Sequence, residues 1–293
     1  MKIAYITYSG IAKYLPANNF NEVEDLLPLL TKKGFDITAE IWDDPKVDWS
    51  KYDVALLKTP WDYHQKYEQF KQWLNRIEAA DVRLLNDFTT VRWNMDKHYL
   101  AEIAQAGFDV IPTLYIERGW TGELLPIFEQ LQSTELIIKP CVSGGSKNTI
   151  VIQKDSSFEQ RAKVIALLSE ADYLVQPLMH EVQNGEWSFV FFNGRYSHTI
   201  LKKPKAGDFR VQQIHGGTIT TIYASQRDID NAATYLQQFA NNIFYARVDG
   251  LMVNGKFMLM ELELIEPFLY LSYGEGAVER YCEALEEQLG RMR

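Results

Sequence analysis

Apolar residues in the first part of the chain follow two different spacings. They dominate residues 2–8, 35–42 and 52–58, which predicts three short buried strands. Between the first two strands, residues 21–33 place a valine and leucines at helical spacing before Gly34, which predicts a helix that ends there. Strands and helices in this order indicate a small parallel sheet with crossover helices. No G-x-G-x-x-G turn follows the first strand, so the sequence does not predict a dinucleotide site.

The rest of the chain combines further helices with strands that can pair in hairpins. Helical spacing predicts helices over residues 65–80, 89–106, 122–131, 158–169, 228–243 and 278–289. Apolar or alternating runs predict strands over residues 82–86, 135–139, 150–153, 173–179, 187–192, 196–203, 243–248 and 257–267. The pairs Asn193-Gly194 and Asn254-Gly255 are typical of tight hairpin turns. The whole pattern predicts an α/β protein.

Length and composition are those of a globular protein with two domains or one large domain. The 293 residues are 46% hydrophobic and 24% charged, with a net charge of -9. This charge argues against a nucleic acid as the main partner, because binding to its backbone needs clustered Lys and Arg. An anionic cofactor still fits, since local basic residues can dominate one site. The charge does not decide the oligomeric state, and a homodimer is compatible with it.

Cysteine usage and the N-terminus bear on the cellular location. Cys141 and Cys282 are far apart and fit neither a disulfide framework nor a metal-binding spacing, which favours a reducing compartment. The chain enters a strand at once without a signal-peptide pattern, and no apolar run approaches membrane-spanning length. We therefore expect a cytoplasmic protein without a membrane partner.

The run F-M-L-M-E-L-E-L-I-E-P at residues 257–267 carries the most informative polar residues. Strict alternation along a strand puts Glu261 and Glu263 on one face, together with Leu259, and Met260 on the other. The hairpin turn can fold Asp249 back beside the two glutamates. Three carboxylates in one place repel each other, and Mg²⁺ bound together with phosphates would relieve the repulsion. The alternative is an exposed polar face of a sheet.

A second segment offers groups that can hold a phosphate. Lys139 ends a predicted strand, and the loop after it contains Ser143, Gly144, Gly145 and Ser146. The glycines allow backbone N–H groups to turn inward as an anion-binding nest, and the lysine adds a point charge. The loop lacks the spacing of a Walker motif. A flexible hairpin tip is the alternative.

Other polar positions are ambiguous by themselves. Lys58 and Asp62 follow the third strand and could hold an acidic or zwitterionic substrate, or Asp62 could simply cap the next helix. Gln176-Pro177 indicates a strand edge or hinge with free backbone groups. Arg210 supplies a guanidinium for a carboxylate or phosphate. Lys97 alone would be a solvated lysine on a helix.

Taken in order, these features resemble the ATP-grasp superfamily. The ordered set is a first lysine, a lysine before a Gly/Ser loop, Q-P-L, F-R-x-x-x-x-G-G, V-D and M-E-x-E. The chain is similar to the glutathione synthetase type and to the ribosomal-protein glutamate ligases. Its motifs T-P-W-D-Y, V-R-W-N-M-D-K and M-E-L-E-L-I-E-P most resemble the branch with the cycloserine-forming cyclo-ligase. The resemblance covers essentially the whole chain.

The resemblance implies an α+β ATP-grasp fold, with a pre-ATP-grasp domain at residues 1–92. Residues 93–293 would be the ATP-grasp domain, with 108–174 as its smaller, lid-like subdomain. Residues with an implied role in nucleotide binding are Lys97, Lys139, Ser143, Gly144, Gly145, Ser146, Gln176, Pro177, Leu178, Glu186 and Arg210. Lys139 and Arg210 would also be catalytic. Asp249, Glu261 and Glu263 would bind Mg²⁺, or Mn²⁺.

The implied activity is an ATP-dependent carboxylate–amine (or thiol) ligase acting through an acyl phosphate. Its substrate would be small and amino-acid-like or a peptide, and the reaction could be an intramolecular cyclisation. Many relatives have Asn at the position of Glu263, so an extra negative charge is expected beside the γ-phosphate. The alternative function is an ATP-binding regulatory or scaffold protein without ligase turnover.

Overall fold

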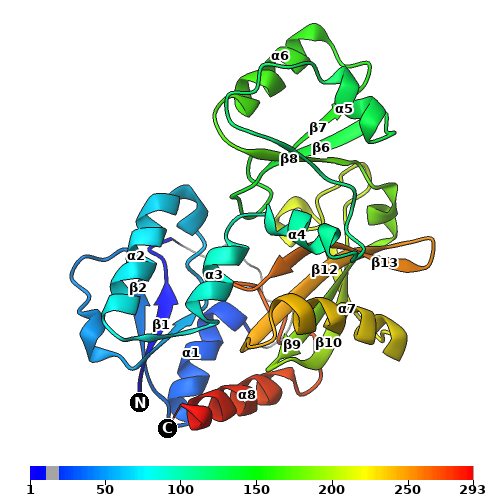
Figure 1. The fold of residues 1–293 in the computed structure, drawn as a ribbon. Helices are drawn as coiled ribbons and strands as arrows, with labels where there is room; N and C mark the ends of the chain where they lie inside the picture. The colour runs from blue at the N-terminus through cyan, green and yellow to red at the C-terminus, as the bar shows by residue number, and fades with distance from the viewer. Residues whose placement is uncertain (11–19, 293) are drawn as a thin grey trace.

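The N-terminal part of the protein is a parallel sheet covered by helices, as predicted. The structure is a computed structural model, and it describes residues 1–10 and 20–292. The strands, in the sheet order β2-β1-β3-β4, are β1 (Lys2–Thr7), β2 (Asp36–Ile41), β3 (Val54–Leu57) and β4 (Arg83–Leu85). The helices α1 (Glu22–Lys32) and α2 (Tyr67–Ala79) bury their apolar faces against this sheet. Figure 1 shows this part beside the larger remainder of the molecule.

A smaller α+β unit forms the upper lobe in Figure 1. Its four-stranded sheet has the order β5-β8-β6-β7, with β5 (Leu114–Ile116), β6 (Glu135–Pro140), β7 (Ile150–Gln153) and β8 (Tyr173–Pro177). The helices α5 (Leu125–Gln130) and α6 (Phe158–Leu168) pack on it. Strand β8 lies between β5 and β6, but β5 pairs only with residues 173–175, so Gln176 and Pro177 pair with β6 alone and form a local edge, as predicted. Proline is tolerated there because it is the last residue of the strand.

An antiparallel sheet forms the centre of the larger unit. Its five strands have the order β11-β10-β9-β12-β13. They are β9 (Glu186–Phe192), β10 (Arg195–Lys203), β11 (Thr218–Ile222), β12 (Tyr245–Val253) and β13 (Lys256–Glu263). The helices α7 (Gln226–Phe239) and α8 (Ala277–Arg291) pack against it. The sequence did not predict β11, because this T-I-T-T-I strand is largely polar and exposed at the sheet edge.

The single helix predicted over residues 89–106 is wrong. The structure has two helices, α3 (Phe88–Asn94) and α4 (Tyr99–Gln105), separated by a break. In the break, the Lys97 backbone N–H donates to the Cys141 carbonyl at 2.9 Å, and the Asp96 carboxylate accepts from the His98 N–H at 3.0 Å. These bonds to groups outside the helix replace the helical ones, so the chain turns at Lys97.

Strict alternation along β13 is also wrong. The pairing between β12 and β13 shifts by one residue between Asp249 and Gly250, which is a β-bulge opposite Met260. Leu259 therefore packs in the core with Leu262, whereas Met260 lines the open side of the sheet. The bulge leaves Glu261 directly opposite Asp249, as the sequence predicted.

The N-terminal sheet and the five-stranded sheet share one hydrophobic core. Side chains of β1 and α1 pack in the same cluster as Phe192, Phe244 and Tyr281, and α8 lies along the base of both units in Figure 1. The buried ion pair of Lys58 with Glu22 also connects this part to the segment after β13, because Lys58 donates to the Pro267 carbonyl and Glu22 accepts from the Leu269 N–H. Within the described residues, no helix is both long and apolar enough to cross a membrane.

Candidate active site

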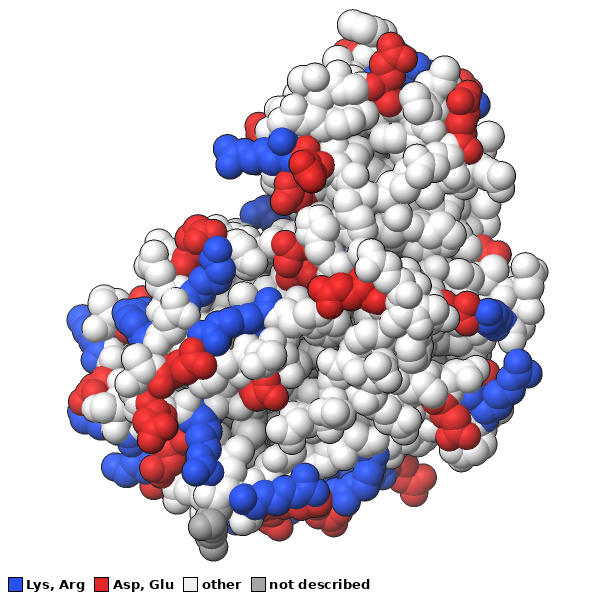
Figure 2. Space-filling view, viewed as in Figure 1, with Lys and Arg blue, Asp and Glu red and all other residues white. Residues whose placement is uncertain are grey.

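A cavity of about 560 Å³ lies where the three sheets meet. The surface is hollowed between the upper lobe and the N-terminal lobe in Figure 2. Every residue with a predicted role in nucleotide or metal binding lines this cavity: Lys97, Lys139, Ser143, Gly144, Gly145, Ser146, Gln176, Pro177, Leu178, Glu186, Arg210, Asp249, Glu261 and Glu263. They come from all parts of the chain between residues 97 and 263. The fold therefore brings together the whole predicted set.

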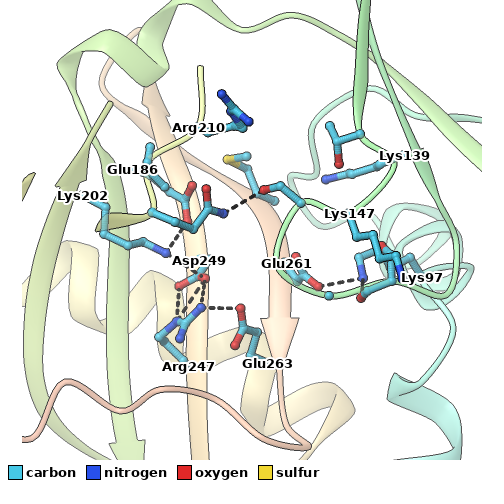
Figure 3. Close-up of a pocket in the computed structure, with 18 of the residues that line it drawn as sticks. Lys97, Lys139, Lys147, Glu186, Lys202, Arg210, Arg247, Asp249, Glu261 and Glu263 are labelled. Atoms are coloured by element: carbon cyan, nitrogen blue, oxygen red, sulfur yellow. Dashed lines mark hydrogen bonds and ion pairs between the residues drawn. The ribbon is translucent and has the colours of Figure 1, made fainter. Parts of the chain in front are cut away.

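Lys97, Lys139 and Lys147 lie on one side of the cavity, and the carboxylates of Glu186, Asp249 and Glu263 lie on the other, paired with Lys202 and Arg247 (Figure 3). Lys97 is 6% exposed, and its Nζ lies 3.0 Å from Glu261 Oε1 and 3.0 Å from the Ser143 carbonyl oxygen. Its expected place on a solvated helix surface is wrong, because the break between α3 and α4 turns it inward. Burial lowers the pKa of Lys97, but the charge and hydrogen bond of Glu261, together with the charges of Glu263 and Glu266, outweigh burial and leave the pKa raised.

Lys139 has no ion-pair partner among the described residues. It projects from β6 into the cavity beside Lys97 (Figure 3). Burial lowers the pKa of Lys139. The charge of Glu261 opposes this shift, and the charge of Lys97 reinforces it. A buried cation that is only partly compensated is a favourable position for a phosphate group.

The carboxylates opposite are compensated by cations of the protein itself. Arg247 contacts Asp249 through two nitrogens, at 2.8 and 3.0 Å, and also pairs with Glu263. Lys202 Nζ lies 3.2 Å from Asp249 and 2.5 Å from Glu186. Burial raises the pKa of Asp249, but Arg247 and Lys202 outweigh burial and hold it well below its usual range. Cations of the protein therefore already offset the repulsion that the sequence analysis expected Mg²⁺ to relieve.

Arg247 and Lys202 were not predicted as site residues. Arg247 is two residues before Asp249 on β12, and Lys202 is paired with Glu186 across β10 and β9. A strand period of two would have put Arg247 on the face of Asp249. Arg247 also pairs with Glu263 and so balances the extra negative charge expected there.

The Gly/Ser loop reaches the Arg210 segment across the cavity. Gly145 and Ser146 have φ of 60° and 61°, a left-handed backbone that turns the loop tightly. The Gln212 side chain donates to Ser146 Oγ at 2.9 Å (Figure 3). Arg210 lies at the rim and pairs with Asp208 at 2.8 Å. Gln176 donates to Thr113 Oγ1 at 2.9 Å, and Pro177 and Leu178 follow it along the cavity.

Glu261 and Glu263 meet the requirements for a metal ligand better than Asp249 does. Their side chains are 30% and 32% exposed, and each uses one oxygen, Oε1, in an ion pair with a cation of the protein. Asp249 uses both oxygens on Ser188, Lys202 and Arg247. Among the described residues, a group of three side chains whose possible metal-ligand atoms lie close together is found at Asp96, His98 and Cys141, away from these carboxylates.

Lys58 and Asp62 have structural roles instead of the substrate contact considered from the sequence. Lys58 is buried against Glu22 and donates to the Pro267 carbonyl at 3.2 Å. Asp62 accepts from the Trp42 indole at 2.8 Å and pairs with Lys66 at 2.6 Å, and its side chain makes no helix-capping bond.

Two α+β units that close on a nucleotide are the defining feature of ATP-grasp proteins, and this chain has that architecture. The crystal structure of D-alanine–D-alanine ligase from Bacillus anthracis in complex with ATP aligns with this structure at a TM-score of 0.71 and 15% identity. The alignment covers 98% of this chain and 95% of that one. Residues 108–267 match the model of the prokaryotic glutathione synthetase ATP-grasp domain, and the chain belongs to this family. It is an ATP-grasp ligase, which forms a C–N bond and releases ADP.

Two further comparisons cover nearly the whole chain. Residues 3–86 match the model of the N-terminal domain of D-cycloserine synthetase DcsG. The cycloserine biosynthesis protein DcsG of Streptomyces lavendulae is 29% identical over 286 residues, which cover 90% of this chain and 94% of that protein. The crystal structure of D-cycloserine synthetase DcsG aligns with a TM-score of 0.83 at 26% identity, covering 99% of this chain and 100% of that chain.

Proposed function

We propose that this ligase activates the carboxylate of a small amino-acid-like or peptide substrate as an acyl phosphate, which an amine then attacks. The similarity to DcsG along the whole chain favours a cyclisation, in which the amine belongs to the same molecule. The observation that carries the proposal is the meeting of Lys97 and Lys139 with Glu261 and Asp249 in one cavity. This arrangement is suited to holding a polyphosphate between charges of opposite sign.

The chain's own residues would act chiefly by position and charge. Lys97 and Lys139 would bind phosphate oxygens, and the loop with Ser143, Gly144, Gly145 and Ser146 would cover them and exclude water. Gln176, Pro177, Leu178 and Glu186 would hold the nucleoside. Arg210 would leave Asp208 to stabilise the phosphoryl group during transfer, a role in which one guanidinium contributes strongly.

Glu261 and Glu263 would hold Mg²⁺, or Mn²⁺, with Asp249 as a third ligand once it gives up contacts to Arg247 or Lys202. A bound Mg²⁺ neutralises phosphate charge. The donor set of carboxylate oxygens fits a hard cation. We further propose that residues 1–92 and 93–293 form the two domains, with 108–174 as a lid, and that the protein acts in the cytoplasm.

The test is ADP release measured with pools of small amino acids and short peptides, with products identified by mass spectrometry. We expect Glu261→Gln to abolish Mg²⁺-dependent ADP release while the fold, measured by circular dichroism, is unchanged. Glu275→Gln, an exposed residue outside the cavity, is the matched control. ATP binding without substrate-stimulated ADP release in the unmodified protein would instead favour a regulatory ATP-binding function.

A further inference from the structure

One carboxylate in the cavity forms no ion pair among the described residues, although the charge of Lys97 acts on it. Within the described structure, the acidic residues that line the cavity are Glu186, Asp249, Glu261, Glu263 and Glu266. The first four each pair with Lys97, Lys202 or Arg247. Among the described residues, Glu266 forms no ion pair, and its carboxylate is hydrogen-bonded to its own backbone N–H. Leaving one carboxylate unpaired in a partly buried site costs free energy, which a positively charged ligand would recover.

The backbone around Glu266 is held in place by side chains. The carbonyl groups of residues 264–269 accept, in order, from the side chains of Asn86, Tyr245, Trp61, Lys58, Arg247 and His198. The bond from Trp61 to the Glu266 carbonyl is 3.1 Å long. Fixed main-chain bonds on both sides of a residue position its side chain before a ligand arrives. The carboxyl group of Glu266 therefore projects from a fixed backbone position.

Aromatic rings surround the same end of the cavity. Tyr8, Trp61 and Tyr63 of the N-terminal domain line it together with Glu266. The centroids of Tyr8 and Trp61 are 6.0 Å apart. Aromatic faces and a carboxylate are the groups that proteins use to bind an organic ammonium. Burial, followed by the charge of Glu263, raises the pKa of Glu266 to about 8, as expected for a carboxylate without an ion-pair partner.

We propose that Glu266 binds the positively charged amino group of the carboxylate substrate and thereby selects amino-acid-like substrates. This inference rests on the proposed ligase function and names a specificity residue for it. Glu266 stands in the M-E-L-E-L-I-E-P motif, but the sequence alone assigns it no role. Its position three residues after Glu263 places it beyond the end of β13, toward the N-terminal domain.

The experiment measures binding and turnover separately, with and without the ammonium group. Small D- and L-amino acids and their N-acetyl derivatives are titrated calorimetrically against the protein with ADP and Mg²⁺, and ADP release is measured with the same compounds and ATP. We expect binding of free amino acids but not of N-acetyl derivatives. Glu266→Gln should weaken this binding by about 10- to 100-fold and remove the preference. Glu275→Gln, with the same change at an exposed position, should not.

The outcomes separate this inference from the proposed function. Amino-acid binding that depends on Glu266 without any ADP release would support the inference and refute the ligase proposal. Turnover with equal affinity for free and N-acetylated compounds would overturn the inference and leave the ligase proposal intact. Failure of the unmodified protein to bind any free amino acid would overturn the inference. Loss of ATP affinity in Glu266→Gln, with amino-acid binding unchanged, would assign Glu266 to the nucleotide site and overturn it as well.

Discussion

Several charged residues of the cavity form ion pairs, and Arg247 shows this most directly. It contacts Asp249 and Glu263 and donates to the Phe268 carbonyl at 2.8 Å. Burial lowers the pKa of Arg247, but both carboxylates outweigh burial and raise it. Arg247 therefore remains charged and keeps the two acidic side chains in defined positions. Removing either member of such a buried pair is far more costly than removing both.

His198 gives a prediction for the pH dependence of stability. It is 5% exposed, and its Nε2 lies 3.0 Å from the Leu269 carbonyl oxygen. Burial lowers the pKa of His198 from 6.5 to about 4. The hydrogen bond to Leu269 opposes this shift, and the charge of Arg280 reinforces it. Between these pH values the unfolded chain binds a proton at His198 that the folded chain does not. The contribution of His198 to stability is thus complete above its unfolded pKa and decreases as the pH falls.

The free energy of unfolding falls between about pH 7 and about pH 4. We expect this fall to be smaller in His198→Gln than in the unmodified protein, by up to about 3 kcal/mol. Glutamine can keep a donor near Leu269 but does not titrate. Urea unfolding of both proteins across this range measures the difference. Equal pH dependence in the two proteins would show that His198 is not held neutral by the fold.

At the scale of elements, the segment after β13 is the main connection between the two halves. Glu22 at the start of α1 accepts from the backbone N–H groups of Leu269 and Leu271 at 2.8 and 3.2 Å, and it pairs with Lys58. Lys58 in turn donates to the Pro267 carbonyl. One buried ion pair therefore satisfies backbone groups of a segment more than 200 residues away in sequence.

We predict that Glu22→Gln destabilises the protein by about 3 kcal/mol or more, because it leaves Lys58 as an uncompensated buried cation. Glu24→Gln, an exposed residue on the same helix, should change stability by less than about 0.5 kcal/mol. Urea unfolding at neutral pH compares the two. A small effect at Glu22 would mean that the pair is not essential to the connection.

At the scale of the whole molecule, the hydrophobic clusters differ in whether they belong to one lobe or are shared between two. The upper lobe has its own cluster, which includes Leu136, Ile138 and Val175. The N-terminal sheet instead shares its cluster with β9 and α8, through side chains such as Phe192 and Tyr281. We therefore expect the N-terminal sheet and the five-stranded sheet to unfold together and the upper lobe to open separately.

Tyr281→Ala tests this division. The ring of Tyr281 is fully buried, with its centroid 5.5 Å from Phe192 and 5.0 Å from Phe244. We expect a loss of about 3–5 kcal/mol. Hydrogen exchange should show lower protection in both β1 and β9, with β6 and β8 unchanged. Phe158→Ala, at a residue that is 88% exposed, is the control. Loss of protection confined to β9 would show that the two sheets are not coupled.

Most of the elements could be predicted from the sequence, because their apolar spacing is local. The resemblance further identified the residues that would bind the nucleotide, and the fold gathers all of them in one cavity. The failures fall where backbone groups bond outside their own element. Lys97 lies at a helix break set by Cys141, and Leu259 is turned inward by a bulge opposite Met260. Neither the bond to Cys141 nor the bulge can be predicted from the spacing of apolar residues along the chain.

The sequence by itself determined the α/β class, the ATP-grasp resemblance and the identity of the charged residues, since these depend on residue type and order along the chain. Only the tertiary structure decided how the charges are paired. Arg247 and Lys202 compensate the carboxylates, whereas Glu266 forms no ion pair with any described residue. Electrostatic free energy depends on distance and burial, and both are set by strands and loops that are far apart in the sequence.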